Sequence, residues 1–332
     1  MLVIISDKPN FYKTNLFNHI NKTKSIFVIY VGEERIKRDE FFYSKNMDFD
    51  YVILFGNKFK KILQLIRYFP KFRKNDIIVS GWDNLFYLIV LMFFRTSVIV
   101  ESTSEDKSRN NFFNKIKYVI KKIVLAKVEK FICAGYRHTD YVKSIYPNKK
   151  IIISNTVGFP FLSEIEALDL TKRKDFVYIG RNSSEKNIGF MIDLFNKSSL
   201  SKNNKLYLVG DNFQEYKNLS NIEIIPKISR DDMANFLKCF HALILTSKSE
   251  SYGLVIEESF RCGIPAIISS KCGIIDTLAF DGENSIIIDI QDIDASVSKI
   301  NRFFQIEELL VRNIKNLDFS VRDYNSIKAF YE

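Results

Sequence analysis

Two glutamates, Glu250 and Glu258, lie where a strand is expected to give way to a helix. The apolar run Ala242–Leu245 predicts a buried parallel strand, and Gly253 permits a tight turn into a helix over Leu254–Arg261. Open α/β sheets bind ligands at the carboxyl ends of their strands, and a helix start offers free N–H groups that suit a phosphate. Because the carboxylates can accept hydrogen bonds from sugar hydroxyls, the spacing predicts a sugar-phosphate site. The alternative is a solvated helix start with a surface glutamate.

A second group of polar residues follows the expected strand Asp175–Ile179. Gly180 lets the backbone turn close to a ligand, and Arg181 and Lys186 offer two cations that suit the two phosphates of a nucleotide sugar. A nucleoside diphosphate gains negative charge as it leaves, so cations held here would stabilise the transition state in place of a metal ion. The alternative for this loop alone is a surface turn that caps the next helix.

Both segments resemble signatures of one enzyme family. Residues 250–258 are similar to the E-x7-E signature of family 4 retaining glycosyltransferases. Residues 180–186 are similar to the G-R-x4-K-G element of that family, with Asn187 in place of its last glycine. The resemblance extends over residues 176–288, and it implies the GT-B fold, in which two doubly wound parallel-sheet α/β domains face each other across a cleft.

The resemblance also implies roles for single residues. Glu250 would orient hydroxyls of the donor sugar, and Glu258 would hold the ribose. Arg181, Lys186 and the helix N-terminus would neutralise the diphosphate, so no metal ion or other cofactor is expected. Transfer would retain the anomeric configuration, with a diphosphate oxygen helping to take the proton of the acceptor. Asp276 matches an acidic residue near the donor, the alternative being an ordinary helix cap. The expected donor-binding residues are Gly180, Arg181, Lys186, Gly210, Ile225, Lys227, Glu250, Ser251, Tyr252, Gly253, Leu254 and Glu258.

The first half departs more from the family. No glycine-rich loop follows the first expected strand, Leu2–Ile5. Where many members have a histidine, this chain has an E-S-T segment similar to that of a subset, which makes Glu101, Thr103 and Arg109 candidates for the cleft. Asp83 follows the preceding strand and is a candidate to hold or deprotonate an acceptor hydroxyl, the alternative being a helix N-cap. The expected catalytic residues are therefore Glu250, Arg181, Lys186, Asp83 and Glu101.

Short apolar runs alternate with amphipathic segments along the chain, which is typical of parallel sheets covered by helices. Its 332 residues exceed the usual size of one domain. We expect an acceptor-binding domain over residues 1–160, a nucleotide-sugar-binding domain over 170–316 and a last helix, 317–332, that crosses back onto the first domain. The expected strands are Leu2–Ile5, Ile26–Val31, Tyr51–Phe55, Asp76–Val79, Ser97–Val100, Phe131–Ala134, Ile151–Ile153, Asp175–Ile179, Lys205–Val209, Ile222–Ile225, Ala242–Leu245, Pro265–Ile268 and Ser285–Asp289. Helices are expected at Lys58–Tyr68, Asp83–Phe94, Phe112–Val128 and Arg137–Ile145.

The charge lies mainly in the first half. Residues 1–168 hold 28 Lys and Arg against 16 Asp and Glu, a net +12, whereas residues 169–332 hold 21 against 23, a net −2. Such asymmetry indicates an anionic partner, although a merely solvated basic face is the alternative. Residues 112–128 would form a helix with an apolar stripe bordered by lysines, which together with Arg67, Lys71, Arg73 and Lys74 predicts peripheral contact with an anionic membrane. The other interpretation is that this stripe packs on the sheet. The basic stretch at residues 66–74 has no recognisable nucleic-acid motif, so a nucleic-acid partner is not expected.

The remaining sequence features bear on location and function. The four cysteines lack metal-ligand spacing and are expected to be reduced core thiols. Met1 leads directly into a strand, and the longest apolar run, Leu85–Phe94, has ten residues where about 20 are needed to span a bilayer. We therefore expect a cytoplasmic protein, peripheral at the inner face of the membrane, that moves a sugar from a UDP- or GDP-linked donor to a glycan or lipid-linked acceptor in the synthesis of lipopolysaccharide, capsule or glycolipid. The alternative is a non-catalytic nucleotide-sugar- or polyanion-binding protein of the same fold.

Overall fold

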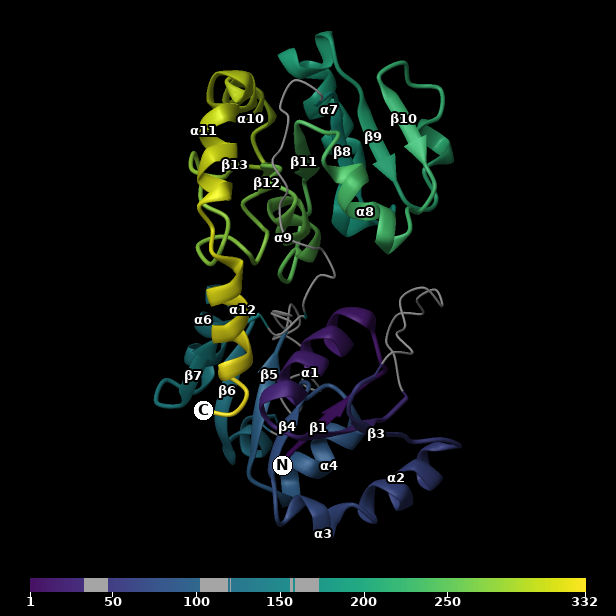
Figure 1. The fold of residues 1–332 in the computed structure, drawn as a ribbon, viewed down its shortest axis with the longest axis vertical. Helices are drawn as coiled ribbons and strands as arrows, with labels where there is room; N and C mark the ends of the chain where they lie inside the picture. The colour runs from purple at the N-terminus through teal and green to yellow at the C-terminus, as the bar shows by residue number, and fades with distance from the viewer. Residues whose placement is uncertain (33–46, 102–118, 120, 156–157, 159–172) are drawn as a thin grey trace. The chain divides into compact units, whose positions relative to one another are not determined.

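The computed structural model describes residues 1–32, 47–101, 119, 121–155, 158 and 173–332. The chain divides into two compact units, Met1–Phe159 with Ser320–Glu332 and Pro160–Phe319. Each unit is built on one parallel sheet with helices packed against it (Figure 1). The expectation of two doubly wound α/β domains is confirmed. None of the described helices is long and apolar enough to cross a membrane.

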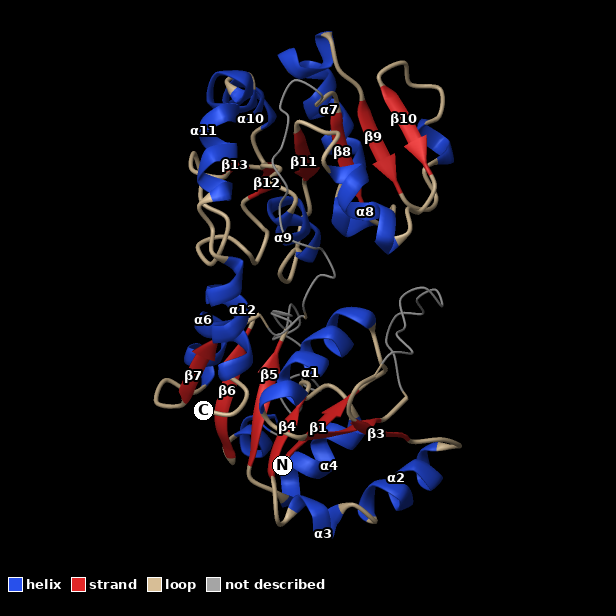
Figure 2. Ribbon diagram, in the orientation of Figure 1, coloured by secondary structure: helices blue, strands red, loops and turns tan. Residues whose placement is uncertain are grey.

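The sheet of the first unit has seven strands, shown in red in Figure 2. They are β1 (Leu2–Ser6), β2 (Ile26–Tyr30), β3 (Asp50–Ile53), β4 (Asp76–Val79), β5 (Thr96–Val100), β6 (Val128–Cys133) and β7 (Lys150–Ile153). Their order is β3-β2-β1-β4-β5-β6-β7, and all neighbours run parallel. The chain therefore changes direction across the sheet between β1 and β4, and the carboxyl ends of these strands flank the place where such sheets bind ligands.

Helices cover both faces of this sheet. On one face lie α2 (Lys58–Ile66), α3 (Phe69–Phe72), α4 (Leu85–Phe93) and α6 (Tyr136–Ile145), which share one core with the strands. On the other face α1 (Phe11–Thr23) packs through Leu16, Phe17 and Ile20. Because the central strands are covered on both sides, their side chains are almost all buried, which explains the unbroken apolar runs of the sequence.

The end of the chain belongs to the first unit. α12 (Phe319–Lys328) carries Ser326, whose carbonyl oxygen accepts a hydrogen bond of 3.0 Å from Ser154 Oγ. The buried Lys130 donates from Nζ to the carbonyl oxygen of Ala329 at 2.9 Å. Ala329 and Phe330 complete the core on the α1 face. These contacts fix the last residues to the sheet formed by the first part of the chain.

The second unit repeats the topology with six strands. They are β8 (Phe176–Ile179), β9 (Leu206–Val209), β10 (Ile222–Ile225), β11 (Ala242–Leu245), β12 (Ala266–Ser269) and β13 (Ser285–Ile288), in the order β10-β9-β8-β11-β12-β13 with all neighbours parallel. The helices are α7 (Ile188–Lys197), α8 (Arg230–Leu237), α9 (Leu254–Arg261), α10 (Ile293–Ile300) and α11 (Phe303–Lys315), with 3-10 turns η3 (Ser184–Lys186), η4 (Ser199–Lys202) and η5 (Gln214–Tyr216). The change of direction falls between β8 and β11.

All thirteen expected strands are present, with ends that differ by up to three residues. The helix expected from Asp83 begins at Leu85 and is capped by Asn84, whose side chain accepts from the N–H of Phe86, so the alternative interpretation of Asp83 as the N-cap is wrong. Of the helix expected over residues 112–128, the first part lies outside the described residues, whereas residues 121–125 are helical. α1 was not expected from the sequence.

Candidate active site

Two loops meet at the carboxyl edge of the second sheet. One follows β8 and carries residues 180–187, and the other follows β11 and carries residues 246–253. β8 and β11 are neighbouring central strands whose connections leave in opposite directions across the sheet. This is the position at which doubly wound folds bind their ligands, because no connection crosses the edge there.

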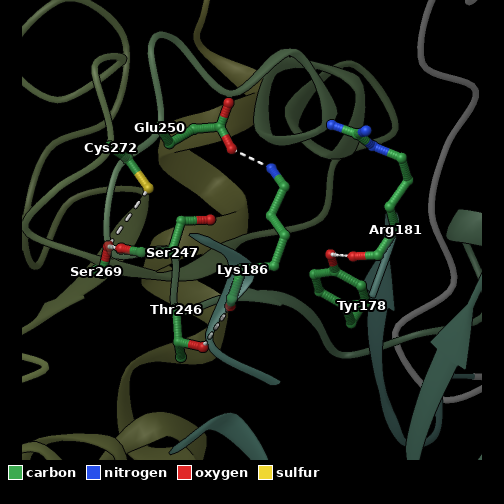
Figure 3. A network of polar contacts seen from close by, with 8 residues as sticks. All are labelled: Tyr178, Arg181, Lys186, Thr246, Ser247, Glu250, Ser269 and Cys272. Carbon is green, nitrogen blue, oxygen red and sulfur yellow. Dashed lines mark hydrogen bonds and ion pairs between the residues drawn. The ribbon is translucent and has the colours of Figure 1, made fainter. Parts of the chain in front are cut away.

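The two loops are joined by an ion pair between Lys186 Nζ and Glu250 Oε2 (Figure 3). The side chains are 20% and 18% exposed, so the pair is within reach of solvent. Further hydrogen bonds to backbone carbonyl oxygens tie the two loops together. Thr246 Oγ1 donates to the carbonyl oxygens of Lys186 and Asn187, and the N–H of Lys248 donates to the carbonyl oxygen of Glu185 at 2.7 Å. The lysine of one sequence motif and the first glutamate of the other are therefore in direct contact.

The backbone at the exit of β8 is packed closely against the exit of β9. A Cβ atom on Gly210, which has φ of 139°, would lie 2.1 Å from the carbonyl oxygen of Gly180. The buried Tyr178 donates from its hydroxyl to the carbonyl oxygen of Arg181 at 2.8 Å, and burial raises the pKa of this tyrosine. The loop is thereby fixed while the side chain of Arg181 is exposed. Asn187, the departure from the family pattern, is in the left-handed region with φ of 57°.

A third loop, which sequence analysis had considered only for Asp276, braces Glu250. The N–H of Glu250 donates to the carbonyl oxygen of Lys271 at 3.2 Å, and the N–H of Gly273 donates to the carbonyl oxygen of Glu250 at 2.9 Å. A Cβ atom on Gly273 would lie 1.9 Å from the carbonyl oxygen of Ser251, so a glycine is required there. Asp276 itself is exposed in a turn with φ of 63° and begins no helix, so the helix-cap alternative is wrong.

Beneath this loop, Ser269 Oγ donates to the carbonyl oxygen of Ser247 at 2.6 Å and lies 3.7 Å from Cys272 Sγ (Figure 3). These atoms are buried. They connect the ends of β11 and β12 and thereby fix the stem of the loop that carries Glu250. Small polar residues at strand ends were the signal in the sequence, but nothing in their spacing distinguished them from other serines and cysteines.

α9 begins at the second motif. Gly253 is its N-cap with φ of 104°, a conformation that other residues adopt rarely. The buried Tyr252 donates from its hydroxyl to Glu257 Oε2 at 2.9 Å, and Arg261 Nη2 lies 2.8 Å from the other oxygen of that carboxylate. Both carboxylate oxygens of Glu257 are thus used in contacts that stabilise the start of α9. Glu258, on the next position of α9, is 8% exposed.

The residues expected near the nucleotide base lie at the exit of β10. The carbonyl oxygen of Ile225 accepts from the N–H of Gly210 at 3.1 Å, which continues the sheet. Lys227 is exposed, and its Nζ lies 2.6 Å from Asp211 Oδ2. This group borders the β8 and β9 exits. Ser251 is exposed and Leu254 is half-buried at the start of α9.

The carboxyl edge of the first sheet carries a second set of polar residues. Lys13 Nζ, from α1, lies 2.9 Å from the buried Oε1 of Glu101, at the exit of β5. Burial raises the pKa of Glu101, and the ammonium of Lys13 partly offsets this effect. Asp7, after β1, accepts a hydrogen bond of 2.5 Å from the hydroxyl of the buried Tyr87.

Two further groups lie on the helices and loops of this edge. His138 of α6 is fully buried, and burial lowers its pKa, an effect that a hydrogen bond with the backbone of Glu101 partly offsets. Asp83 is exposed in the loop before α4. Thr103 and Arg109 lie outside the described residues. Of the residues expected in the first half, the structure therefore places Asp83 and Glu101 on one sheet edge and adds Lys13, Asp7, Tyr87 and His138, which sequence analysis missed.

Comparison with known proteins bears first on the half of the chain that carries the Lys186–Glu250 pair. Residues 163–317 match the family described as glycosyl transferases group 1. Among curated proteins, the chain is 26% identical over 195 residues to an uncharacterized glycosyltransferase of Methanocaldococcus jannaschii, covering 57% of this chain and 53% of that one. It is also 26% identical over 143 residues to the N-acetyl-alpha-D-glucosaminyl L-malate synthase of Bacillus anthracis, covering 41% and 37%. The matches thus span about half or less of these relatives.

Solved structures extend the likeness to the whole chain. WaaG, described as a glycosyltransferase involved in lipopolysaccharide biosynthesis, superposes with a TM-score of 0.65 at 10% identity over 100% of both chains. Anabaena HepE, solved with UDP and glucose, superposes with a TM-score of 0.69 at 12% identity over 99% and 97%. With the two parallel sheets, these matches show that the chain has the GT-B fold. In the described residues, no group of three or more His, Cys, Asp or Glu is arranged to hold a metal ion.

Proposed function

We propose that this protein is a retaining glycosyltransferase of the family 4 type, which moves a sugar from a UDP- or GDP-linked donor to a glycan or lipid-linked acceptor. The observation that carries the proposal is the ion pair between Lys186 and Glu250 at the carboxyl edge of the second sheet. It brings together the cation of one motif and the carboxylate of the other. The match of residues 163–317 to group 1 glycosyl transferases supports it.

The donor replaces each partner of the ion pair with a group of its own. The diphosphate takes the ammonium of Lys186, together with the guanidinium of Arg181 and the N–H groups at the start of α9. The carboxylate of Glu250, released from Lys186, accepts hydrogen bonds from hydroxyls of the sugar, and Glu258 holds the ribose. No metal ion is required in this arrangement, because the protein itself supplies the positive charge opposite the diphosphate.

In the reaction the bond between the anomeric carbon and the diphosphate oxygen breaks, and its electron pair passes to the diphosphate. The hydroxyl oxygen of the acceptor bonds to the anomeric carbon on the same face, and its proton passes to a diphosphate oxygen. Lys186 and Arg181 stabilise the charge that develops on the leaving group, and electrostatic stabilisation of this kind is usually the largest single contribution to catalysis.

The first unit supplies the groups that we assign to the acceptor. Glu101 is held by Lys13, and Asp83 is exposed on the same sheet edge, so both are placed to accept a hydrogen bond from an acceptor hydroxyl. We further propose that the acceptor belongs to lipopolysaccharide, capsule or glycolipid synthesis and that the protein works peripherally at the inner face of the cytoplasmic membrane. The basic balance of residues 1–168 and the likeness to WaaG support this assignment.

The test is a panel of UDP- and GDP-sugars, scored both for hydrolysis and for a shift in melting temperature. We expect one donor to be hydrolysed slowly without acceptor, and Lys186→Ala and Glu250→Ala to reduce turnover by about two to three decades. Lys217→Ala and Glu308→Ala remove exposed charges elsewhere in the second unit and should leave turnover unchanged. A melting shift without turnover by any donor would favour the non-catalytic binding protein instead.

A further inference from the structure

α2 presents an apolar face to solvent. Phe55, Phe59, Leu63 and Ile66 are 61%, 70%, 47% and 44% exposed, and their spacing of four, four and three residues places them along one side of the helix. We call these four residues the α2 stripe. Single exposed apolar side chains are common in soluble proteins, but a continuous row on one helix marks an interaction surface.

The stripe is held in place by its own surroundings. Phe55 precedes the helix, but the side-chain amide of Gln64 on α2 forms two hydrogen bonds with its backbone. The N–H of Phe55 donates to Gln64 Oε1 at 3.3 Å, and Gln64 Nε2 donates to the carbonyl oxygen of Phe55 at 2.9 Å. Lys60 Nζ lies 4.5 Å from the centre of the Phe55 ring. The backbone of Phe55 is therefore fixed to α2, which reduces the entropy lost when the stripe is covered.

The stripe lies within an unusually basic segment. Residues 51–75 contain seven Lys and Arg and no Asp or Glu. Five of the seven are exposed: Lys58 and Lys60 on α2, Arg67 directly after it, and Arg73 and Lys74 after α3. An apolar row flanked by long cationic side chains matches an anionic lipid surface, because the rings and aliphatic groups enter the acyl region while the charges remain at the phosphates.

We propose that the α2 stripe docks the first unit onto an anionic lipid bilayer. The sequence predicted the apolar stripe over residues 112–128 and counted Arg67, Lys71, Arg73 and Lys74 only toward a shared basic face, so the apolar face of α2 is the part that the sequence did not predict. The end of the 112–128 segment that the structure describes adds to the same type of surface, since Val119 and Ile123 are 53% and 66% exposed. Docking through α2 does not depend on the proposed transfer reaction.

The position of α2 links the docking surface to the polar edge of the same unit. Four residues separate the end of β3 from the start of α2, on the carboxyl side of the sheet, and Lys61 Nζ donates at 2.8 Å to the carbonyl oxygen of Val31, directly after β2. The edge that carries Asp7 and Glu101 is therefore on the side of the unit where α2 begins. If the proposed function holds, a docked α2 would bring this edge close to lipid-linked acceptors.

The experiment is co-sedimentation with vesicles of phosphatidylglycerol and phosphatidylcholine, compared with phosphatidylcholine alone. The wild type should bind only the anionic vesicles and should be released by salt. Phe59→Ser with Leu63→Ser should weaken binding by about tenfold or more, and Lys58→Glu with Arg67→Glu by about 25-fold or more. The matched controls are Leu219→Ser with Leu309→Ser and Lys197→Glu with Lys217→Glu, which change exposed residues of the second unit and should bind as the wild type does.

A probe within the stripe shows whether it enters the lipid. Leu63→Cys in a Cys239→Ser background leaves one exposed cysteine for an environment-sensitive fluorophore, because Cys133, Cys262 and Cys272 are buried. We expect a blue shift on anionic vesicles and quenching by spin-labelled acyl chains. Absence of binding, binding unchanged in the stripe variant, or a wild-type dimer that the stripe variant separates would each overturn the proposal. Donor hydrolysis without vesicles should be unaffected by the stripe variant, so failure of docking and failure of the proposed function are distinguishable.

Discussion

Replacing Glu250 with glutamine should separate nucleotide binding from sugar transfer. In the structure the ammonium of Lys186 is paired with the carboxylate of Glu250. A nucleoside diphosphate must therefore compete with this carboxylate for the same cation. The substitution removes the competitor, keeps the shape of the side chain and leaves Lys186 in place. UDP or GDP should consequently bind more tightly to the variant, although transfer falls.

The size of the effect follows from the exposure of the pair. Two unit charges about 4 Å apart interact by about 1 kcal/mol in water and by about 4 kcal/mol where the effective dielectric constant is 20. Because the two side chains are 20% and 18% exposed, solvent screens part of this interaction. A gain of about 1 to 2 kcal/mol remains, which is about five- to thirtyfold in diphosphate affinity. Turnover should fall by about two to three decades because a contact to the sugar in the transition state is lost.

The assay is calorimetric titration of UDP and GDP into the wild type, Glu250→Gln, Lys186→Met and the double variant. The gain from Glu250→Gln should be largely absent when Lys186 is methionine, since no cation is left to release. Glu308→Gln, on the exposed side of α11, controls for the change in net charge. Unchanged or weaker diphosphate binding in Glu250→Gln would refute the competition, and so would an equal gain in the Lys186→Met background.

Three further outcomes are expected. Turnover should persist in excess chelator, because protein cations neutralise the diphosphate; loss of activity that magnesium or manganese restores would contradict this. Lys13→Met should raise the pKa of Glu101 further and move the acid limb of the pH–rate profile to higher pH, whereas Lys13→Arg should not; a limb that stays in place in both variants would remove Glu101 from the reaction. Because burial lowers the pKa of His138, its contribution to stability is present above the unfolded pKa of about 6.5 and is lost as the pH falls toward the folded value. His138→Phe should therefore lose less unfolding free energy than the wild type between about pH 7 and about pH 5.5 in urea titrations, and an equal loss in the two proteins would argue against it.

The sheets could be predicted from the sequence because their strands are buried on both faces. Short apolar runs such as Leu2–Ser6, without alternating polar residues, are typical of strands buried in a parallel sheet. α1 was missed for the opposite reason: residues 11–23 are rich in Asn and Thr, which favour a helix weakly, and only tertiary packing of Leu16, Phe17 and Ile20 determines its conformation. The exposed apolar face of α2 could not be predicted either, because the apolar pattern of a helix does not show which of its apolar residues face the core.

The sequence named Lys186 and Glu250 as candidates, but it could not predict that they are in contact. Lys186 and Glu250 each stood in a recognisable motif, yet they are 64 residues apart, and only the adjacency of β8 and β11 brings them into contact. The brace formed by Lys271 and Gly273 consists of backbone hydrogen bonds, which leave almost no trace in side-chain types. Gly273 was the one available signal, because a glycine inside a strand-exit loop indicates a close backbone approach.

Each sheet edge carries a lysine–glutamate pair, and the two pairs differ in what a ligand can do to them. In the first unit Lys13 is 9% exposed, and the Glu101 oxygen that it contacts is buried although the whole Glu101 side chain is 27% exposed, so a ligand can reach the other carboxylate oxygen while the ion pair stays in place. In the second unit both partners reach solvent, and a donor that brings phosphate oxygens and sugar hydroxyls can replace both at once. The first pair is therefore suited to fixing the charge of one carboxylate, whereas the second is suited to exchange with a substrate. It follows that Lys13 variants should change the pH dependence of the reaction, and Glu250 variants the affinity for the nucleotide.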